Sequence, residues 1–120
     1  MSGHDSSKFN NIMKRIIDNS LFTERQIEII LNSQNRLELD TRISRGGYYR
    51  QLGQSKGKLA KFRYTMILLQ ALEIIGPEEV DVMSKLSEQL SVIKDSDILS
   101  EKEEEVMGVI ERVIEQASGA

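Results

Sequence analysis

The chain has 120 residues, a length that suits one domain and is too short for two. It has no cysteine, which excludes disulfides and thiolate chemistry and favours a reducing, cytoplasmic location. The formal net charge of −3 hides two unlike parts, because residues 1–76 carry twelve Lys and Arg against seven Asp and Glu, whereas residues 77–120 carry four against twelve. The start of the chain lacks the basic and apolar regions of a signal peptide, and no apolar run approaches the roughly 20 residues of a membrane span, so we expect no membrane partner.

Two amphipathic helices are predicted at the beginning of the chain. The first has an apolar stripe at helical spacing, formed by Phe9, Ile12, Met13, Ile16 and Ile17, and should end at Asn19-Ser20. Thr23 and Gln26 have the spacing of a reciprocal capping box, in which each side chain binds a backbone N–H of the other residue. We therefore expect a second helix that begins after Thr23 and stops near residues 32–35.

The middle of the chain is predicted as one or two further helices. Residues 36–42 are either a short helix or extended, and Ser44 is the expected N-cap of the next helix. Gly53 and Gly57 weaken that helix by about 1 kcal/mol each, which favours a kink or break. Residues 59–75 are apolar nearly all round, a pattern typical of a helix buried at the domain centre or in a subunit interface.

The acidic part, residues 77–120, is predicted as two helices separated by a polar joint at residues 94–97. Gly76-Pro77 should end one helix and begin the next, with the glycine in the left-handed position. Ser100 and Glu103 predict a second capping box. The first acidic helix has a narrow apolar seam, formed by Met83, Leu86, Leu90 and Ile93. The fold class is therefore all-α, a small single domain of five to six helices with a basic part (8–76) and an acidic extension (77–120), whose seams either complete the core or pair with a second copy.

A segment without acidic residues is the strongest functional signal. Between Thr41 and Tyr64 the basic residues are Arg42, Arg45, Arg50, Lys56, Lys58, Lys61 and Arg63. Lys and Arg neutralise phosphates and release counterions, while Arg and Gln also match the edges of guanine and adenine. A run of charges is often only a solvated helix face, but such a face usually mixes both signs. The pattern indicates a nucleic-acid partner.

Two stretches resemble helix-turn-helix domains of the LuxR and sigma-factor region 4 type. Phe22-Thr23-Glu24-Arg25-Gln26-Ile27-Glu28-Ile29-Ile30 is similar to the first helix of such domains. Ile43-Ser44-Arg45-Gly46-Gly47-Tyr48-Tyr49-Arg50-Gln51-Leu52 is similar to their turn and recognition helix. The resemblance covers residues 22–59 and implies a transcriptional regulator whose helix from Ser44 lies in the major groove of duplex DNA. The sequence departs from that pattern at Arg42, where the family has glycine, and at the glycines after Ser44.

The residues expected to bind DNA are Arg42, Ser44, Arg45, Gly46, Tyr49, Arg50, Gln51, Lys56 and Lys58. Among them Arg45, Tyr49 and Arg50 are expected in the groove, with Gln51 as a base reader and the lysines on phosphates. Gly46 would allow the sugar-phosphate chain to approach the helix N-terminus closely. The alternatives are an RNA-binding protein that uses the same face and a protein–protein adaptor whose two charged halves dock partners of opposite sign.

Catalysis, metal binding and cofactor binding are not expected. His4 is the only histidine and lies in a polar start, and no cysteine is present to complete a zinc site. Glu101 and Glu103 to Glu105 are typical of an acidic helix start, and no phosphate-binding glycine motif occurs. The protein is thus predicted to be a non-enzymatic homodimer, with an acidic half that either dimerises or recruits the transcription machinery.

Overall fold

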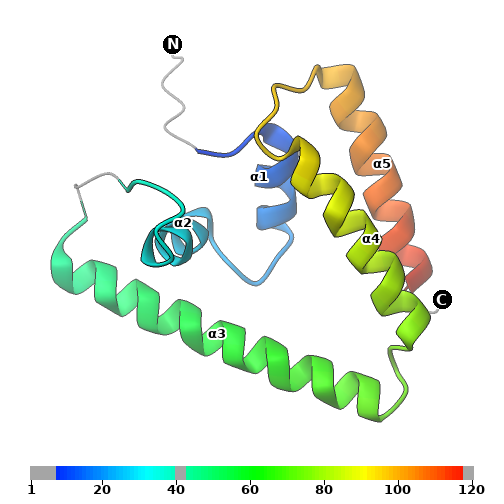
Figure 1. Cartoon of the computed structure of the whole chain (residues 1–120), viewed down its shortest axis with the longest axis horizontal. Coiled ribbons are helices and arrows are strands. Elements are labelled where there is room, and N and C mark those ends of the chain that lie inside the picture. The colour runs from blue at the N-terminus through cyan, green and yellow to red at the C-terminus, as the bar shows by residue number, and fades with distance from the viewer. Residues whose placement is uncertain (1–7, 40–42, 118–120) are drawn as a thin grey trace. The chain divides into compact units, whose positions relative to one another are not determined.

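The computed structural model describes residues 8–39 and 43–117, and within them every regular element is a helix (Figure 1). The helices are α1 (Asn11–Asp18), α2 (Glu24–Ser33), α3 (Arg45–Ala71), α4 (Pro77–Ile93) and α5 (Ser100–Ala117). The all-α prediction is confirmed. No helix of the described ranges combines the length and the apolar content needed to cross a bilayer.

Backbone contacts divide the chain into two compact units. One unit contains residues 16–67, and the other contains the residues before and after that range. The divisions fall inside α1 and α3, whereas the charge of the sequence changes sign at Gly76-Pro77. Packing therefore groups the start of α1 and the end of α3 with the acidic helices.

In the unit that holds α4 and α5, Asn10 joins the start of α1 to the end of α4. Its Oδ1 accepts a hydrogen bond from the Met13 N–H at 2.9 Å and so caps α1. Its Nδ2 donates to the carbonyls of Ile93 at 2.9 Å and Ser96 at 3.0 Å. One side chain thus satisfies a free N–H at the start of α1, the carbonyl of the last residue of α4 and a carbonyl just beyond it.

The apolar sides of α4 and α5 are used inside this unit. The two helices pack on each other, Met107 and Ile110 of α5 are buried, and the α4 seam that includes Leu86 and Leu90 is half-buried. The sequence left open whether this seam completes the core or pairs with a second copy. In the structure the seam packs beside α5 and contributes to the core of the unit.

The predicted capping box at Ser100 is wrong. Ser100 is already inside α5, and the Glu103 N–H donates to the Leu99 carbonyl at 2.9 Å. The carboxylates of Glu103 and Glu104 accept hydrogen bonds from the Arg15 guanidinium of α1 at 3.0 and 2.6 Å. These bonds, that to Glu104 foremost, raise the pKa of Arg15. The Glu103 carboxylate thus binds Arg15, which is distant in sequence, and not the start of its own helix.

The start of α2 has the predicted capping box. The Gln26 N–H donates to Thr23 Oγ1 at 3.1 Å, and the Thr23 N–H donates to Gln26 Oε1 at 3.1 Å. At the other end Asn35 adopts a left-handed φ of 60°. This conformation lets the Arg36 N–H reach the Leu31 carbonyl at 2.9 Å, the pattern of a Schellman ending. Residues 36–39 then continue without helix, so the short-helix alternative is wrong for the described part of residues 36–42.

The third helix is continuous through both of its central glycines, so the expected kink or break does not occur. Ser44 Oγ accepts a hydrogen bond from the Gly47 N–H at 3.0 Å, which confirms Ser44 as the cap. Residues 34–44 separate α2 from α3, a longer connection than the three or four residues of a helix-turn-helix turn.

The end of α3 differs from the prediction. Glu73, not Gly76, takes the left-handed conformation, with φ of 60°. The Ile74 N–H consequently donates to the Leu69 carbonyl at 2.8 Å. Gly76 instead precedes α4 with an extended backbone, and Pro77 occupies the first helical turn as expected. The helix stops earlier because its own carbonyls are satisfied within the chain by residues 73–75.

Burial of residues 59–75 at the domain centre was also wrong. Phe62, Tyr64, Ile67 and Leu68 are exposed. Apolar composition all round a helix therefore did not lead to burial of these side chains within the described residues.

Candidate nucleic-acid interface

The inner face of α3 is the side that contacts α2. Tyr48 Oη donates to Asn32 Oδ1 at 2.7 Å, and Asn32 Nδ2 donates in turn to the Leu37 carbonyl at 2.9 Å. Farther along α3, Ser55 is fully buried, and its hydroxyl donates to the Gln51 carbonyl at 2.8 Å. The small side chain at position 55 allows close packing at the centre of this face.

A second set of contacts joins α3 to the beginning of α2. Lys58 Nζ donates to the Leu21 carbonyl and to Gln26 Oε1, both at 2.7 Å, and lies 5.7 Å from the centre of the Phe22 ring. Gln26 Nε2 donates to Gln51 Oε1 at 3.5 Å. Gln26, only 5 % exposed, therefore caps α2 and anchors α3 with one amide group.

The outer face of α3 is its opposite side, and it is lined by small residues. Gly46, Gly53, Gly57 and Ala60 follow one another at spacings of seven, four and three, which places them on one line because a helix has about 3.6 residues per turn. All four are exposed. A Cβ added to any of the three glycines would meet no heavy atom within 4 Å. The three glycines therefore serve no packing role among the described residues, although each costs helix stability.

Exposed cations flank this line on both sides. Arg45, Lys56 and Arg63 lie along one edge, and Arg50 and Lys61 lie along the other, as their helical spacing requires. Arg45 and Arg63 are eighteen positions apart, which corresponds to about 27 Å at 1.5 Å per residue. Within the described residues none of these cations forms an ion pair. The outer face thus presents uncompensated positive charge beside a surface that another molecule can approach closely.

Most of the residues predicted to bind DNA lie on or beside this outer face. Arg45, Gly46, Arg50 and Lys56 are exposed there, and Tyr49 is 58 % exposed with its ring edge-on to Tyr48 at 5.3 Å. Ser44 caps the helix that carries them. Arg42 lies outside the described residues.

Two predicted residues are on the wrong side of the helix. The Gln51 side chain is half-buried and bonded to Gln26, so it does not face the surface where a base would lie. The Lys58 ammonium is bonded to Leu21 and Gln26, so it is not a free phosphate contact. Both positions point toward α2 because the 100° turn per residue separates them from Arg50 and Lys56.

No family model, curated protein or solved structure matches this chain.

Two exposed cations, Lys61 and Arg63, were left out of the residues expected to bind DNA, because they were expected to lie too far along the helix to reach its phosphates. In the continuous helix Lys61 instead extends the edge begun by Arg50, and Arg63 extends the edge begun by Arg45 and Lys56. The line of small residues was also missed, although its spacing is readable from the sequence once one helix is assumed.

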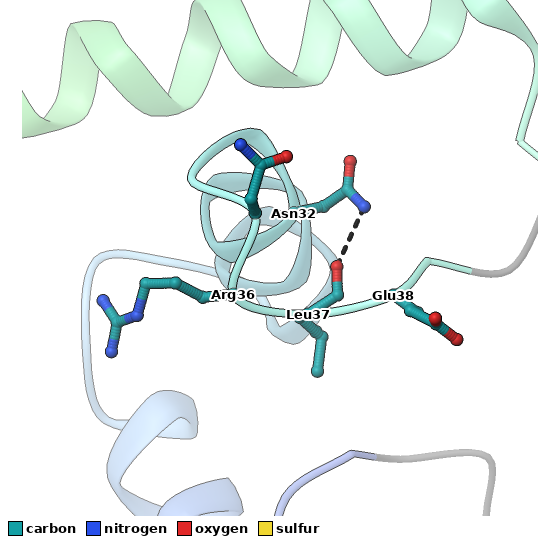
Figure 2. A pocket seen from close by; sticks show the side chains of 5 residues that line it. Asn32, Arg36, Leu37 and Glu38 are labelled. Carbon is teal, nitrogen blue, oxygen red and sulfur yellow. Dashed lines mark hydrogen bonds between the residues drawn. The ribbon is translucent and has the colours of Figure 1, made fainter.

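A hollow at the end of α2 does not form a second site. It measures about 430 Å³ and is lined by Asn32, Asn35, Arg36, Leu37 and Glu38. Figure 2 shows that the Arg36 and Glu38 side chains point in opposite directions, away from a common centre. The Arg36 guanidinium also donates to Gln34 Oε1 at 3.1 Å. The polar groups here do not converge on one ligand, and no group of three metal-binding side chains was found among residues 8–39 and 43–117.

Proposed function

We propose that the chain binds duplex DNA through the outer face of α3 and acts in transcription control. One observation carries the proposal: five exposed cations follow both edges of a line of small residues, with no acidic side chain between residues 41 and 64. An ordinary solvated helix of this length would set acids against bases at i, i+4. Here the positive charge is left for a partner.

Phosphate groups are the ligands that best match the positive charge of this face. Duplex DNA carries one negative charge per roughly 1.7 Å of its axis, so a row of cations about 27 Å long meets several phosphates in succession. The exposed glycines, which have free space around them, allow the sugar-phosphate chain to lie near the helix backbone. Because these cations form no ion pair with the described residues, binding breaks no such contact.

Base contacts are expected only near the start of the helix. Arg45, Tyr49 and Arg50 are exposed within its first two turns, next to the cap formed by Ser44. The free N–H groups of a helix start also favour phosphate oxygens. With Gln51 turned inward, the proposed interface has more groups for the DNA backbone than for base edges, so we expect strong binding to any duplex and modest preference for one sequence.

RNA is the alternative that a specific observation favours. Tyr49 and Tyr64 are exposed, Tyr64 by 76 %, and both lie on the outer side of α3. Exposed aromatic rings beside cations can stack unpaired bases, which is how single-stranded RNA is commonly bound. Competition between a 25-base-pair DNA duplex and a single-stranded RNA of equal length decides between the two. Preference for the RNA would replace the DNA proposal.

The test compares two lysines that differ by two positions and by the face they occupy. Fluorescence anisotropy with a random-sequence duplex is measured from 25 to 200 mM salt for the wild type, Lys56→Gln and Lys58→Gln. Loss of Lys56 should weaken binding and reduce the salt slope by about one unit. Loss of Lys58 removes the same charge but should leave the slope nearly unchanged. Absence of duplex binding at the lowest salt would overturn the proposal and favour the adaptor.

A further inference from the structure

A hollow lies between the start of α4 and the end of α5. The two helices run antiparallel within one unit, so these two ends are side by side (Figure 1). The hollow measures about 180 Å³ and is lined by Glu78, Glu79, Val82, Val113 and Gln116. Pockets for small-molecule ligands usually begin at roughly 300 Å³, so this hollow suits a single side chain better than a whole small molecule.

The lining of the hollow favours a cation with an apolar stem. Glu78 and Glu79 form no ion pair with any described residue. The last turn of α5 carries no basic residue, so the negative end of its helix dipole is also uncompensated. The two valines are the apolar part of the lining, with Val82 45 % exposed and Val113 half-buried. Carboxylates beside apolar side chains match Lys or Arg, whose stem is buried while its charged end stays near water.

We propose that the hollow binds the Arg63 side chain of a second copy of this chain, so that α4 and α5 of one copy cover part of the outer face of α3 of another. The proposal does not depend on nucleic-acid binding. It keeps the expected self-association through residues 77–120, but the contact joins unlike charges and not two acidic seams.

Charge selects a second copy as the occupant. Residues 77–120 carry twelve acids against four bases, whereas residues 41–64 carry seven bases and no acid. Two copies that meet through like parts repel each other, and two that meet through unlike parts attract each other. Arg63 is exposed and forms no ion pair with the described residues, so it is available to the hollow of another copy.

The surroundings of Arg63 also match the hollow. A guanidinium has five N–H donors in a planar fork, so it can bind both carboxylates at once, which an ammonium does less well. Tyr64 adjoins Arg63 and Ile67 follows it by one helical turn, and these two side chains are 76 and 66 % exposed. Their apolar surface matches the exposed part of Val82, so charge and apolar contact act at the same place.

The experiment measures mass by sedimentation equilibrium on the full chain from 1 to 500 μM. At 25 mM salt the wild type should rise above the mass of one chain, and at 500 mM salt it should return toward that mass, because exposed charges are screened. Glu78→Gln together with Glu79→Gln should raise the dissociation constant about tenfold. The matched control, Glu88→Gln with Asp95→Asn, removes the same charge from exposed positions away from the hollow and should stay within about twofold of the wild type.

Mixing two charge-reversed variants identifies the contact. Arg63→Glu by itself should stay a monomer, and so should Glu78→Arg with Glu79→Arg, because like charges then meet at the hollow. An equimolar mixture of these two variants should associate, since the hollow of each then meets the opposite charge at position 63 of the other. A contact within one chain would not be restored by mixing. Circular dichroism of all variants verifies that they remain helical.

Each result bears on a different part of the proposal. A wild type that stays a monomer at 500 μM and 25 mM salt overturns self-association. Equal weakening in the variant of the hollow and in its control overturns the hollow, and a mixture that stays monomeric overturns its pairing with Arg63. The mass is measured without DNA, so failure of this proposal and failure of DNA binding are distinguishable.

Discussion

Lys56 and Lys58 are two residues apart on α3, yet they belong to opposite faces of the helix. Lys58 Nζ lies 2.7 Å from both the Leu21 carbonyl and Gln26 Oε1, whereas Lys56 is exposed and has no ion-pair partner among the described side chains. The basic segment thus has two uses. One of its cations holds α3 against the start of α2, and the outward ones remain available to a partner.

Removal of the inner lysine should therefore be seen in stability. Lys58→Met keeps the apolar stem but loses two charge-assisted hydrogen bonds, and leaves the Leu21 carbonyl to water. Because Lys58 is only half-buried, we expect a loss of about 1 kcal/mol in the free energy of unfolding. Urea denaturation measures it, with Lys56→Met as the control that should stay within about 0.5 kcal/mol of the wild type. Equal loss in both variants would contradict the division into two faces.

Glycines of the outer face give a test in which stability and binding change in opposite directions. Gly53→Ala and Gly57→Ala add a Cβ that meets no described heavy atom within 4 Å, so each should stabilise the helix by about 0.5–1 kcal/mol. If the sugar-phosphate chain lies close to these positions, the double variant should bind duplex DNA several-fold more weakly. Thermal unfolding and anisotropy titration measure the two effects. A double variant that is more stable and binds as tightly as the wild type would place the DNA elsewhere.

Arg45 is the expected base contact. Replacement by alanine should cost about 1–3 kcal/mol of DNA affinity and relax sequence preference at one position. Lys61→Gln, in contrast, should weaken binding to all sequences evenly. Selection of bound sequences from a random duplex pool, followed by titration of the selected sites, distinguishes these outcomes. The same preference in the wild type and in Arg45→Ala would mean that Arg45 contacts only phosphate.

The amide of Gln26 should be the most sensitive polar group of the unit that holds α2. It accepts from Thr23 N–H and from Lys58 Nζ and donates to Gln51. Gln26→Leu keeps the size but removes all of these bonds from a position that is 5 % exposed. We expect a loss of about 2–3 kcal/mol, measured by urea denaturation. Thr23→Val, which removes only one capping bond, should cost about 1 kcal/mol.

The left-handed residue after α2 predicts an order of stability among three variants. Asn35 has a φ of 60°, a conformation that glycine adopts freely and that β-branched residues resist. Asn35→Gly should be neutral or slightly stabilising, Asn35→Ala should cost about 1 kcal/mol, and Asn35→Val should cost more. Thermal unfolding of the three variants gives the order. A destabilised glycine variant would show that the Asn35 side chain contributes more than its backbone tolerance.

Local chemistry determined the features that the sequence predicted well. The capping box of Thr23 and Gln26, the cap at Ser44 and the proline that begins α4 each depend on groups within four residues of one another. The periodic apolar residues likewise determined that the chain is helical. The acid-free segment could be found from composition alone, since charge does not depend on the fold.

Tertiary structure alone decided which side of each helix is free. Lys56 and Lys58 are the same residue type in the same basic segment. Only the position of Leu21 and Gln26 decides that Lys58 forms hydrogen bonds within the chain. The spacing of Glu103 from Ser100 is that of a capping box, but in the structure its carboxylate accepts a hydrogen bond from Arg15, which is distant in sequence. In the same way the apolar residues after Ala60 look like core in the sequence, yet Phe62, Tyr64 and Ile67 are exposed. Sequence periodicity gives the angle between two side chains on a helix, but which of them faces the interior depends on where the neighbouring helix packs.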